Sequence, residues 1–115
     1  MATGKIPVAR VSELPPGQTR KFSFDRDGES TEAFLANVGG EFVAYVNRCV
    51  HIPIPLDLDD NDFFTGDGQL FVCKTHGSTY DPRVGKCIGG PGQGKSLEKL
   101  PVVIEDGVVY FDLSE

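Results

Sequence analysis

Two short motifs constrain this chain more than any other feature of its 115 residues. The first is Cys49-Val50-His51 and the second is Cys73-Lys74-Thr75-His76, so each pairs one cysteine with one histidine. Together they contain both histidines of the chain and two of its three cysteines. Thiolate and imidazole are the protein ligands that suit iron and zinc. The sequence therefore predicts a metal site with four ligands, which are Cys49, His51, Cys73 and His76.

The spacing within each motif fits ligands that lie close together. In an extended segment residues i and i+2 point to the same side, so Cys49 and His51 can both reach inward from one loop. The second motif has one more spacer, which suits a turn. Structural zinc sites usually pair cysteine with cysteine and histidine with histidine, whereas both motifs here are mixed. A zinc site that stabilises a binding module remains an alternative, because ligand type alone does not decide the metal.

The residues around the ligands extend the pattern over positions 47–91. The first motif lies in Asn47-Arg48-Cys49-Val50-His51 and is followed by Pro55-Leu56-Asp57. The second continues as His76-Gly77-Ser78-Thr79-Tyr80-Asp81, with Gly85 and Gly90-Pro91 beyond it. In these stretches the chain resembles the Rieske family, in which the two cysteines bind one iron of a 2Fe-2S cluster and the two histidines bind the other. The resemblance implies a Rieske-type 2Fe-2S cluster as the cofactor.

The resemblance also gives roles to two hydroxyl groups. In high-potential members of the family, a serine two places after the second histidine and a tyrosine four places after it donate hydrogen bonds to sulfur atoms. Ser78 and Tyr80 occupy these places, so both are expected to belong to the cofactor-binding site and to tune its reduction potential. The alternative is that Ser78 caps the turn and Tyr80 packs as a half-buried aromatic residue.

The sequence departs from the family pattern at three points. These departures affect the expected partner and reduction potential and leave the four ligands unchanged. Val50 replaces a frequent proline, Thr75 replaces a frequent tryptophan, and the interval between the motifs is longer than usual. Membrane-anchored Rieske subunits also carry a disulfide between the two loops. The equivalent positions here are Ile54 and Thr75, so that disulfide cannot form, which agrees with a reducing compartment.

Hairpin signals predict that the rest of the chain is all β. Residues 33–38 and 42–46 flank Gly39-Gly40-Glu41, and residues 102–105 and 108–111 flank Asp106-Gly107. An Asp-Gly pair between β-branched and aromatic runs is a strong hairpin signal. Turn-forming residues also predict a turn at Asp27-Gly28 and a break at Pro15-Pro16-Gly17. Before this break we expect an edge strand over residues 6–11. No window longer than about ten residues keeps helical periodicity without a glycine or proline.

The predicted fold is a single domain spanning residues 1–115. Residues 1–46 and about 93–115 form an antiparallel β-sandwich or barrel base of the Rieske type. A cluster-binding subdomain of two loops, about residues 47–92, is inserted between them. The third cysteine, Cys87, is expected to be a small buried hydrophobic residue, and a reactive thiol near the cluster is the alternative.

Charge and composition restrict the partners. A net charge of −6 and a pI near 4.8 exclude nucleic acid, whose phosphates require a basic surface, and favour a basic partner. The acidic stretch at positions 57–62 is interpreted as a solvated loop, with a docking patch and a calcium loop as alternatives. The sequence shows no signal peptide and no apolar run of membrane-spanning length, so we expect a cytoplasmic protein that makes no membrane contact.

The ligand assignment also restricts the chemistry. If His51 and His76 bind the cluster, no histidine is left for the two-histidine, one-carboxylate iron site of Rieske oxygenases. We therefore expect no catalytic residues and an electron carrier in place of an enzyme. The resemblance implies a stand-alone Rieske ferredoxin, monomeric when free, that passes one electron from a reductase to an oxygenase or another oxidoreductase. The alternative is a non-catalytic subunit held permanently in a larger oxidoreductase.

Overall fold

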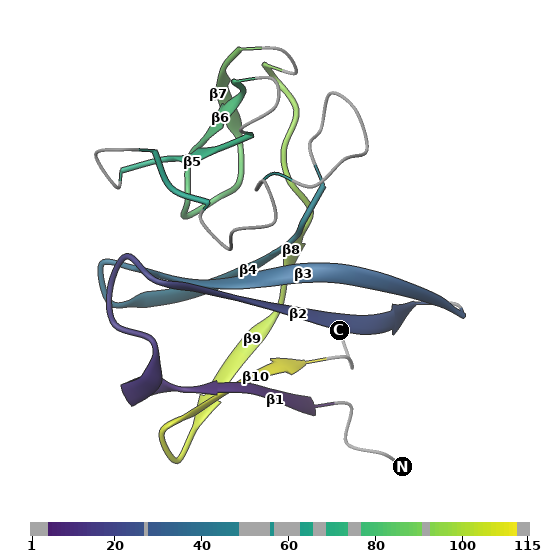
Figure 1. Cartoon of the computed structure of the whole chain (residues 1–115), viewed down its shortest axis with the longest axis vertical. Helices are drawn as coiled ribbons and strands as arrows, with labels where there is room; N and C mark the ends of the chain where they lie inside the picture. The colour runs from purple at the N-terminus through teal and green to yellow at the C-terminus, as the bar shows by residue number, and fades with distance from the viewer. Residues whose placement is uncertain are drawn as a thin grey trace.

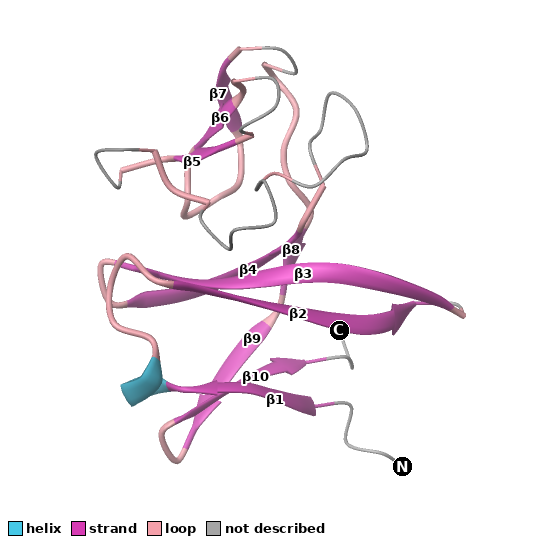
Figure 2. Ribbon diagram, in the orientation of Figure 1, coloured by secondary structure: helices cyan, strands magenta, loops and turns pink. Residues whose placement is uncertain are grey.

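Strands dominate a computed structural model that describes residues 5–26, 28–48, 56, 63–65, 69–73, 77–90 and 93–112. These residues contain ten strands, all in antiparallel pairs, and one 3-10 turn, η1 (Val11–Glu13), that the sequence did not predict (Figures 1 and 2). The all-β prediction is confirmed. The strands are β1 (Lys5–Arg10), β2 (Thr19–Arg26), β3 (Glu29–Val38), β4 (Glu41–Val46), β5 (Phe71–Val72), β6 (Thr79–Tyr80), β7 (Cys87–Gly89), β8 (Lys99–Leu100), β9 (Val102–Glu105) and β10 (Val108–Asp112).

Two sheets form the base of the molecule, with strand orders β1-β10-β9 and β2-β3-β4-β8. The predicted hairpins β3–β4 and β9–β10 are both present, and β1 is an edge strand as expected. Asp106 and Gly107 have φ values of 51° and 76°, which is the conformation that a tight two-residue hairpin requires at both positions. Gly28 also has a positive φ of 84° between β2 and β3, while its neighbour Asp27 lies outside the described residues.

The base sheets enclose one of two hydrophobic cores. Phe24 and Phe111 meet there with ring centroids 4.6 Å apart. Apolar side chains from both sheets surround this pair because each strand turns one face inward. The buried members of this core are Ala9, Leu14, Phe24, Ala33, Leu35, Phe42, Ala44, Val46, Leu100, Val109 and Phe111.

A third sheet, with strand order β5-β6-β7, lies at the end of the molecule away from both termini (Figure 1). A second hydrophobic core forms beneath it, against the opposite face of β3 and β4 from the first core. Its centre is aromatic, with Phe34 stacked on Phe63 at 3.9 Å between centroids. The members of this second core are Phe34, Ala36, Val38, Val43, Tyr45, Leu56, Phe63, Phe64, Phe71, Cys73, Tyr80, Cys87 and Leu97.

The second half of β3 is buried on both faces, and this burial explains its sequence. All residues from 33 to 38 are buried, with alternate side chains entering the two different cores. A strand covered on both sides reads as a continuous apolar run without the usual alternation, as positions 33–36 do, and Asn37 is a buried polar residue whose side chain forms hydrogen bonds with the Leu14 carbonyl and the Gly40 amide. The middle sheet therefore connects the base to the third sheet.

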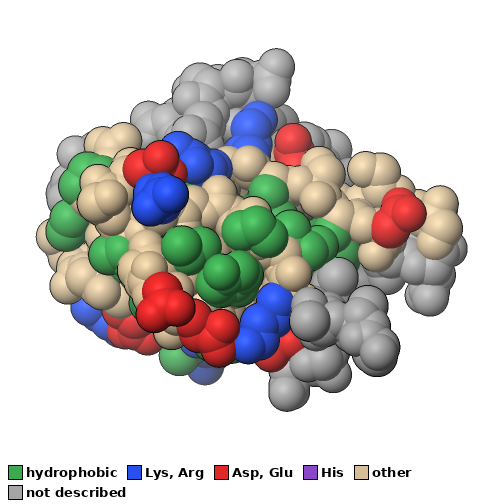
Figure 3. All heavy atoms as spheres, turned by 90° about the horizontal axis from the view of Figure 1, so that it is seen from below, with side chains coloured by type: hydrophobic (Ala, Val, Ile, Leu, Met, Phe, Trp, Pro, Cys, Tyr) green, Lys and Arg blue, Asp and Glu red, His purple; other side chains and the backbone are tan. Residues whose placement is uncertain are grey.

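The outer face of sheet β1-β10-β9 closes the opposite end of the molecule. Seen from below, hydrophobic side chains gather in the middle of this face and charged groups of both signs lie around them (Figure 3). An ion pair between Lys5 Nζ and Glu105 Oε2, at 2.7 Å, crosses the sheet here. Within the part of the chain that the structure describes, no helix is long and apolar enough to cross a membrane.

Candidate metal centre

One of the four predicted ligands, Cys73, lies among the described residues. It follows β5 directly, its side chain is fully buried, and its thiol is not in a disulfide. Cys49, His51 and His76 lie outside the described residues, as do Ile54, Thr75 and the acidic stretch 57–62. A buried cysteine outside any disulfide can serve as a soft metal ligand, because its ionised sulfur can bind iron where water is excluded.

Backbone hydrogen bonds fix the chain on both sides of the second motif. The Cys73 amide donates to the Ser78 carbonyl at 2.8 Å, and the Gly77 amide donates to the Cys73 carbonyl at 2.7 Å. The antiparallel pairing of β5 with β6 continues this contact, with Val72 opposite Thr79. Cys73 is therefore held directly against Gly77 and Ser78, the residues that follow His76 in the sequence.

Ser78 and Tyr80 are both fully buried beside Cys73. Tyr80 pairs with Phe71 across β5 and with Cys87 across β7, and its ring belongs to the second core. Tyr80 is thus fully buried and not half-buried, and its ring packs in the core as the alternative expected. Among the described residues, every buried side-chain nitrogen or oxygen has a hydrogen-bond partner.

Gly90 brings the end of β7 close to the second motif. Its φ is 80°, and a Cβ atom there would lie 2.9 Å from Ser78 Cα and 3.0 Å from the Gly77 carbonyl oxygen. A side chain would therefore meet rigid backbone in a conformation that L-residues disfavour. Glycine lets the segment after β7 pass directly over Gly77 and Ser78. Pro91, predicted to continue this covering segment, lies outside the described residues.

Cys87 is buried, with 1% of its surface exposed, so the prediction of a small buried hydrophobic residue is confirmed. Its Sγ donates to the Gly89 carbonyl at 3.3 Å, and its amide donates to the Lys95 carbonyl at 2.7 Å. Both Cys73 and Cys87 belong to the second core as free cysteines. The two thiols share one apolar environment, but Cys73 belongs to the second motif and Cys87 does not.

Asn47 connects the approach to the first motif with the base. Its Nδ2 donates to Glu32 Oε1 at 2.9 Å, and its Oδ1 accepts from the Leu56 amide at 2.8 Å. Its own amide donates to the Glu32 carbonyl at 2.9 Å. Asn47 is buried, and its bond from the Leu56 amide is buried as well, whereas its bond to the exposed Glu32 carboxylate is part-buried. These bonds hold the two sides of the first motif together. The sequence signal for this role is an asparagine two residues before Cys49, since its side chain offers both a donor and an acceptor.

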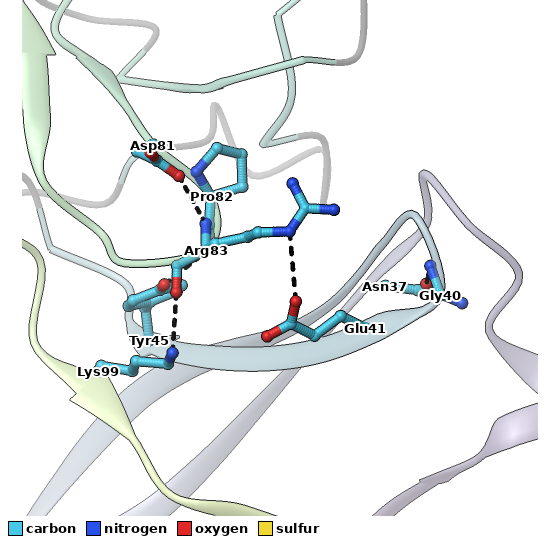
Figure 4. Close-up of polar contacts among 8 residues, drawn as sticks. All are labelled: Asn37, Gly40, Glu41, Tyr45, Asp81, Pro82, Arg83 and Lys99. Carbon is cyan, nitrogen blue, oxygen red and sulfur yellow. Dashed lines mark hydrogen bonds and ion pairs between the residues drawn. The ribbon is translucent and has the colours of Figure 1, made fainter.

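Tyr45 joins the middle sheet to the turn between β6 and β7 (Figure 4). Its hydroxyl donates to the Pro82 carbonyl at 2.7 Å, and its side chain is fully buried. Burial raises the pKa of Tyr45, and the negative charges of Asp81 and Glu41 raise this pKa further. Gly85 packs against the same ring, since a Cβ at Gly85 would lie 2.7 Å from Tyr45 Cε1.

Charged side chains strengthen the same junction at its edge. Arg83 Nε lies 3.3 Å from Glu41 Oε1, and Lys99 Nζ donates to the Arg83 carbonyl at 2.8 Å (Figure 4). Within the turn, the Arg83 amide donates to Asp81 Oδ1 at 2.9 Å. The exposed ion pair adds little free energy by itself. Together with Tyr45, these contacts fix the β6–β7 turn on β4 and β8.

A buried cysteine, a mixed cysteine–histidine motif and a small all-β scaffold fit an iron–sulfur electron carrier, and the family match shows that class. The chain belongs to the Rieske [2Fe-2S] domain family, whose model matches residues 4–104. Its fold is of the Rieske type and its cofactor is a Rieske-type 2Fe-2S cluster, as the sequence predicted. The residues that the structure describes around Cys73 fit this group, because they supply a buried free thiol within an apolar core.

Known proteins of similar length agree with this class. The chain is 31% identical over 108 residues to a 3-phenylpropionate/cinnamic acid dioxygenase ferredoxin subunit of Photorhabdus laumondii, covering 94% of this chain and 93% of that protein. The ferredoxin of Sphingomonas yanoikuyae B1 superposes with a TM-score of 0.69 at 26% identity, over 94% of this chain and 97% of that one. A chain from the complex of oxygenase and ferredoxin in carbazole 1,9a-dioxygenase shares the fold, with a TM-score of 0.75 at 24% identity, over 96% of this chain and 94% of that one.

Proposed function

We propose that this protein is a stand-alone ferredoxin that takes single electrons from a reductase and passes them to a terminal oxygenase. The observation that carries the proposal is the match along nearly the whole chain to a protein named as the ferredoxin subunit of a dioxygenase. The proposed domain covers residues 1–115, with a cluster-binding subdomain at about 47–92. We propose that it is monomeric when free, which size-exclusion chromatography checks.

The proposed ligands are Cys49 and Cys73 for one iron and His51 and His76 for the other. The burial of Cys73 and its hydrogen bonds to Gly77 and Ser78 support this assignment. When bound, the cluster takes up and releases one electron. The residues of the chain keep water away from Cys73 and hold the approaches to the two motifs in place.

Ser78 and Tyr80 are proposed to donate hydrogen bonds toward the sulfur atoms of the site. Both hydroxyl-bearing side chains are fully buried, Ser78 directly before β6 and Tyr80 within it. Donors directed at sulfur favour the additional negative charge of the reduced state and so raise the reduction potential. We also propose a cytoplasmic location, because Ile54 and Thr75 stand where membrane-anchored Rieske subunits have a disulfide, and its absence agrees with a reducing compartment.

Two cysteine variants test the ligand assignment against a matched control. Cys73→Ser should lose the iron and the visible absorption of the cluster, whereas Cys87→Ser should keep both. Both cysteines are buried in the same core, so general destabilisation would affect the two variants alike. Metal and acid-labile sulfide analysis of the unmodified protein should give two irons and two sulfides per chain. One zinc and no sulfide would exclude a ferredoxin.

Electron transfer is tested with the cluster-loaded protein. With a candidate reductase and oxygenase present, adding the protein should couple oxidation of the reductase to formation of product. The chemically reduced protein alone, mixed with aromatic substrates and oxygen, should form none. Product without an oxygenase would show that the chain is itself an enzyme.

A further inference from the structure

A chain of polar contacts crosses the middle sheet and ends at the first motif. It begins on β2 with Lys21, whose Nζ lies 3.9 Å from Glu32 Oε2 on β3. The other carboxylate oxygen, Glu32 Oε1, accepts a hydrogen bond from Asn47 Nδ2 at 2.9 Å. Asn47 Oδ1 in turn accepts a hydrogen bond from the Leu56 amide at 2.8 Å. The contacts therefore run from β2 over β3 to the two residues that bracket positions 48–55.

Glu32 lies at the edge of the second core. Its side chain is on the same face of β3 as Phe34 and Ala36, which belong to that core. The β2–β3 hairpin extends past the third sheet (Figure 1), and the Glu32 side chain is 42% exposed whereas Phe34 is fully buried. The carboxylate is therefore in contact with water on one side and with the buried Asn47 on the other.

The contact with Glu32 fixes the direction in which the Asn47 amide faces. An asparagine side chain has a donor end and an acceptor end, whereas an ionised carboxylate only accepts. Glu32 therefore binds the nitrogen of this amide and directs its oxygen toward the Leu56 amide, which needs an acceptor. With a donor at position 32 the Asn47 amide would turn over, and its NH2 group would face the N–H group of Leu56.

Both ends of this contact are anchored in the fold. Leu56 is fully buried in the second core, and the Asn47 backbone amide donates to the Glu32 carbonyl at 2.9 Å. Asn47 and Leu56 thus hold together the ends of the segment that contains Cys49 and His51 in the sequence. Fixing these ends in advance lowers the conformational entropy that the segment loses when its residues bind a ligand.

We infer that Glu32 is a positioning residue for the metal centre, and that it acts by orienting the Asn47 amide, which holds the ends of the first motif together. This inference rests on the proposed ligands Cys49 and His51 and adds a residue from outside both motifs. Its consequence is the lifetime of the cluster, because a first motif whose ends are not held together should release iron sooner.

Three substitutions at position 32 test the inference through the order of their effects. Glu32→Gln keeps an acceptor for Asn47 Nδ2, Glu32→Ala removes it, and Glu32→Lys replaces it with a donor. Loss of iron from the cluster-loaded protein to a chelator is followed by visible absorption. It should accelerate about twofold in Glu32→Gln, about fivefold in Glu32→Ala and more than about tenfold in Glu32→Lys. If the side chain only covered neighbouring surface, Glu32→Lys would resemble Glu32→Gln and Glu32→Ala would be the most affected, and that order would overturn the inference.

Two control variants remove the effects of charge and of the ion pair. Asp25 is an exposed carboxylate on the same face of the sheet and lies opposite Ser30, so Asp25→Lys changes the net charge as Glu32→Lys does. Lys21→Gln removes the ion pair and leaves Glu32 Oε1 in place. Each control should alter the rate of iron loss less than about twofold. An equal acceleration in Asp25→Lys and Glu32→Lys would overturn the inference.

A double variant tests whether Glu32 acts through Asn47. Asn47→Ala removes the amide that Glu32 orients, so adding Glu32→Lys to Asn47→Ala should accelerate iron loss less than about twofold further. If Glu32→Lys had the same large effect with and without the Asn47 amide, Glu32 would act by another route and the inference would be overturned.

Hydrogen exchange of the cluster-loaded protein, measured by mass spectrometry, separates a local effect from a general loss of stability. In Glu32→Ala the peptide that contains Leu56 should exchange about fivefold faster, whereas a peptide from β10 should exchange as before. Equal acceleration in both peptides would show general destabilisation and overturn the inference. A normal cluster in Cys49→Ser would refute the proposed ligands, whereas a cluster that is lost in Cys49→Ser and unaffected in the Glu32 variants would refute the positioning role alone.

Discussion

Replacing Gly85 with alanine tests the junction between the middle sheet and the third sheet. Gly85 has a φ of 80°, and its added Cβ would lie 2.7 Å from Tyr45 Cε1 and 3.4 Å from the Leu97 carbonyl oxygen. The Tyr45 ring cannot easily move away, since it is fully buried and its hydroxyl is bound to Pro82. The substitution therefore introduces both backbone strain and overpacking.

Gly107→Ala is a matched control that separates the two effects. Gly107 has a φ of 76° and no atom within 4 Å of its hypothetical Cβ, so only backbone strain acts there. A left-handed conformation costs an alanine roughly 1–2 kcal/mol, partly offset by about 0.4–1 kcal/mol from the less flexible unfolded chain. The expected loss for Gly107→Ala is about 1 kcal/mol. Overpacking adds roughly 1–3 kcal/mol, so Gly85→Ala should lose about 2–4 kcal/mol.

Thermal and denaturant unfolding of the cluster-loaded variants measures this difference. At a conversion of about 4 °C per kcal/mol for a chain of this length, Gly107→Ala should lower Tm by about 4 °C and Gly85→Ala by roughly 8–16 °C. The slope of the denaturant curve should stay constant, because the surface exposed on unfolding does not change. Equal losses in the two variants would show that Tyr45 does not pack tightly against the β6–β7 turn.

Three further predictions concern single side chains. The pKa of Tyr45 is raised above its ordinary value of 10.0, so above about pH 10 the folded protein keeps a proton that the unfolded chain releases. The free energy of unfolding should therefore fall as pH rises above about 10, and it should fall less steeply in Tyr45→Phe. Asn47→Ala removes one buried and one part-buried hydrogen bond and should cost about 2 kcal/mol. It should also speed cluster loss, and chemical denaturation and the decay of visible absorption measure the two effects. Ser78→Ala and Tyr80→Phe should each lower the reduction potential by roughly 40 mV if each hydrogen bond strengthens by about 1 kcal/mol on reduction; voltammetry that shows unchanged potentials in both would exclude tuning by these hydroxyls.

The strands of the base could be predicted because their signals are local. Asp106-Gly107 sets a turn that only a few residue pairs can adopt, and the apolar runs beside it have the right length for strands. The burial of Cys87 followed from composition alone. The Cys73 motif could also be recognised in the sequence, because a cysteine and a histidine at short spacing suffice to suggest a metal site.

The contacts between layers could not be predicted because they join residues distant in the sequence. Nothing near Tyr45 indicates that its hydroxyl binds the carbonyl of Pro82, 37 residues later. Full burial of Tyr80 likewise depends on a third sheet made of strands only two or three residues long, which carry little periodicity of their own.

The double burial of β3 has a consequence for how the molecule unfolds. Phe34 and Ala36 belong to the core beneath the third sheet, while Ala33 and Leu35 belong to the core of the base. Because one strand contributes side chains to both cores, loss of packing in one core also removes packing contacts from the other. The base and the third sheet should therefore melt in one cooperative transition. Removal of the iron should then increase amide exchange as far away as β10. Amide exchange in the base would therefore report on the state of a site at the opposite end of the molecule.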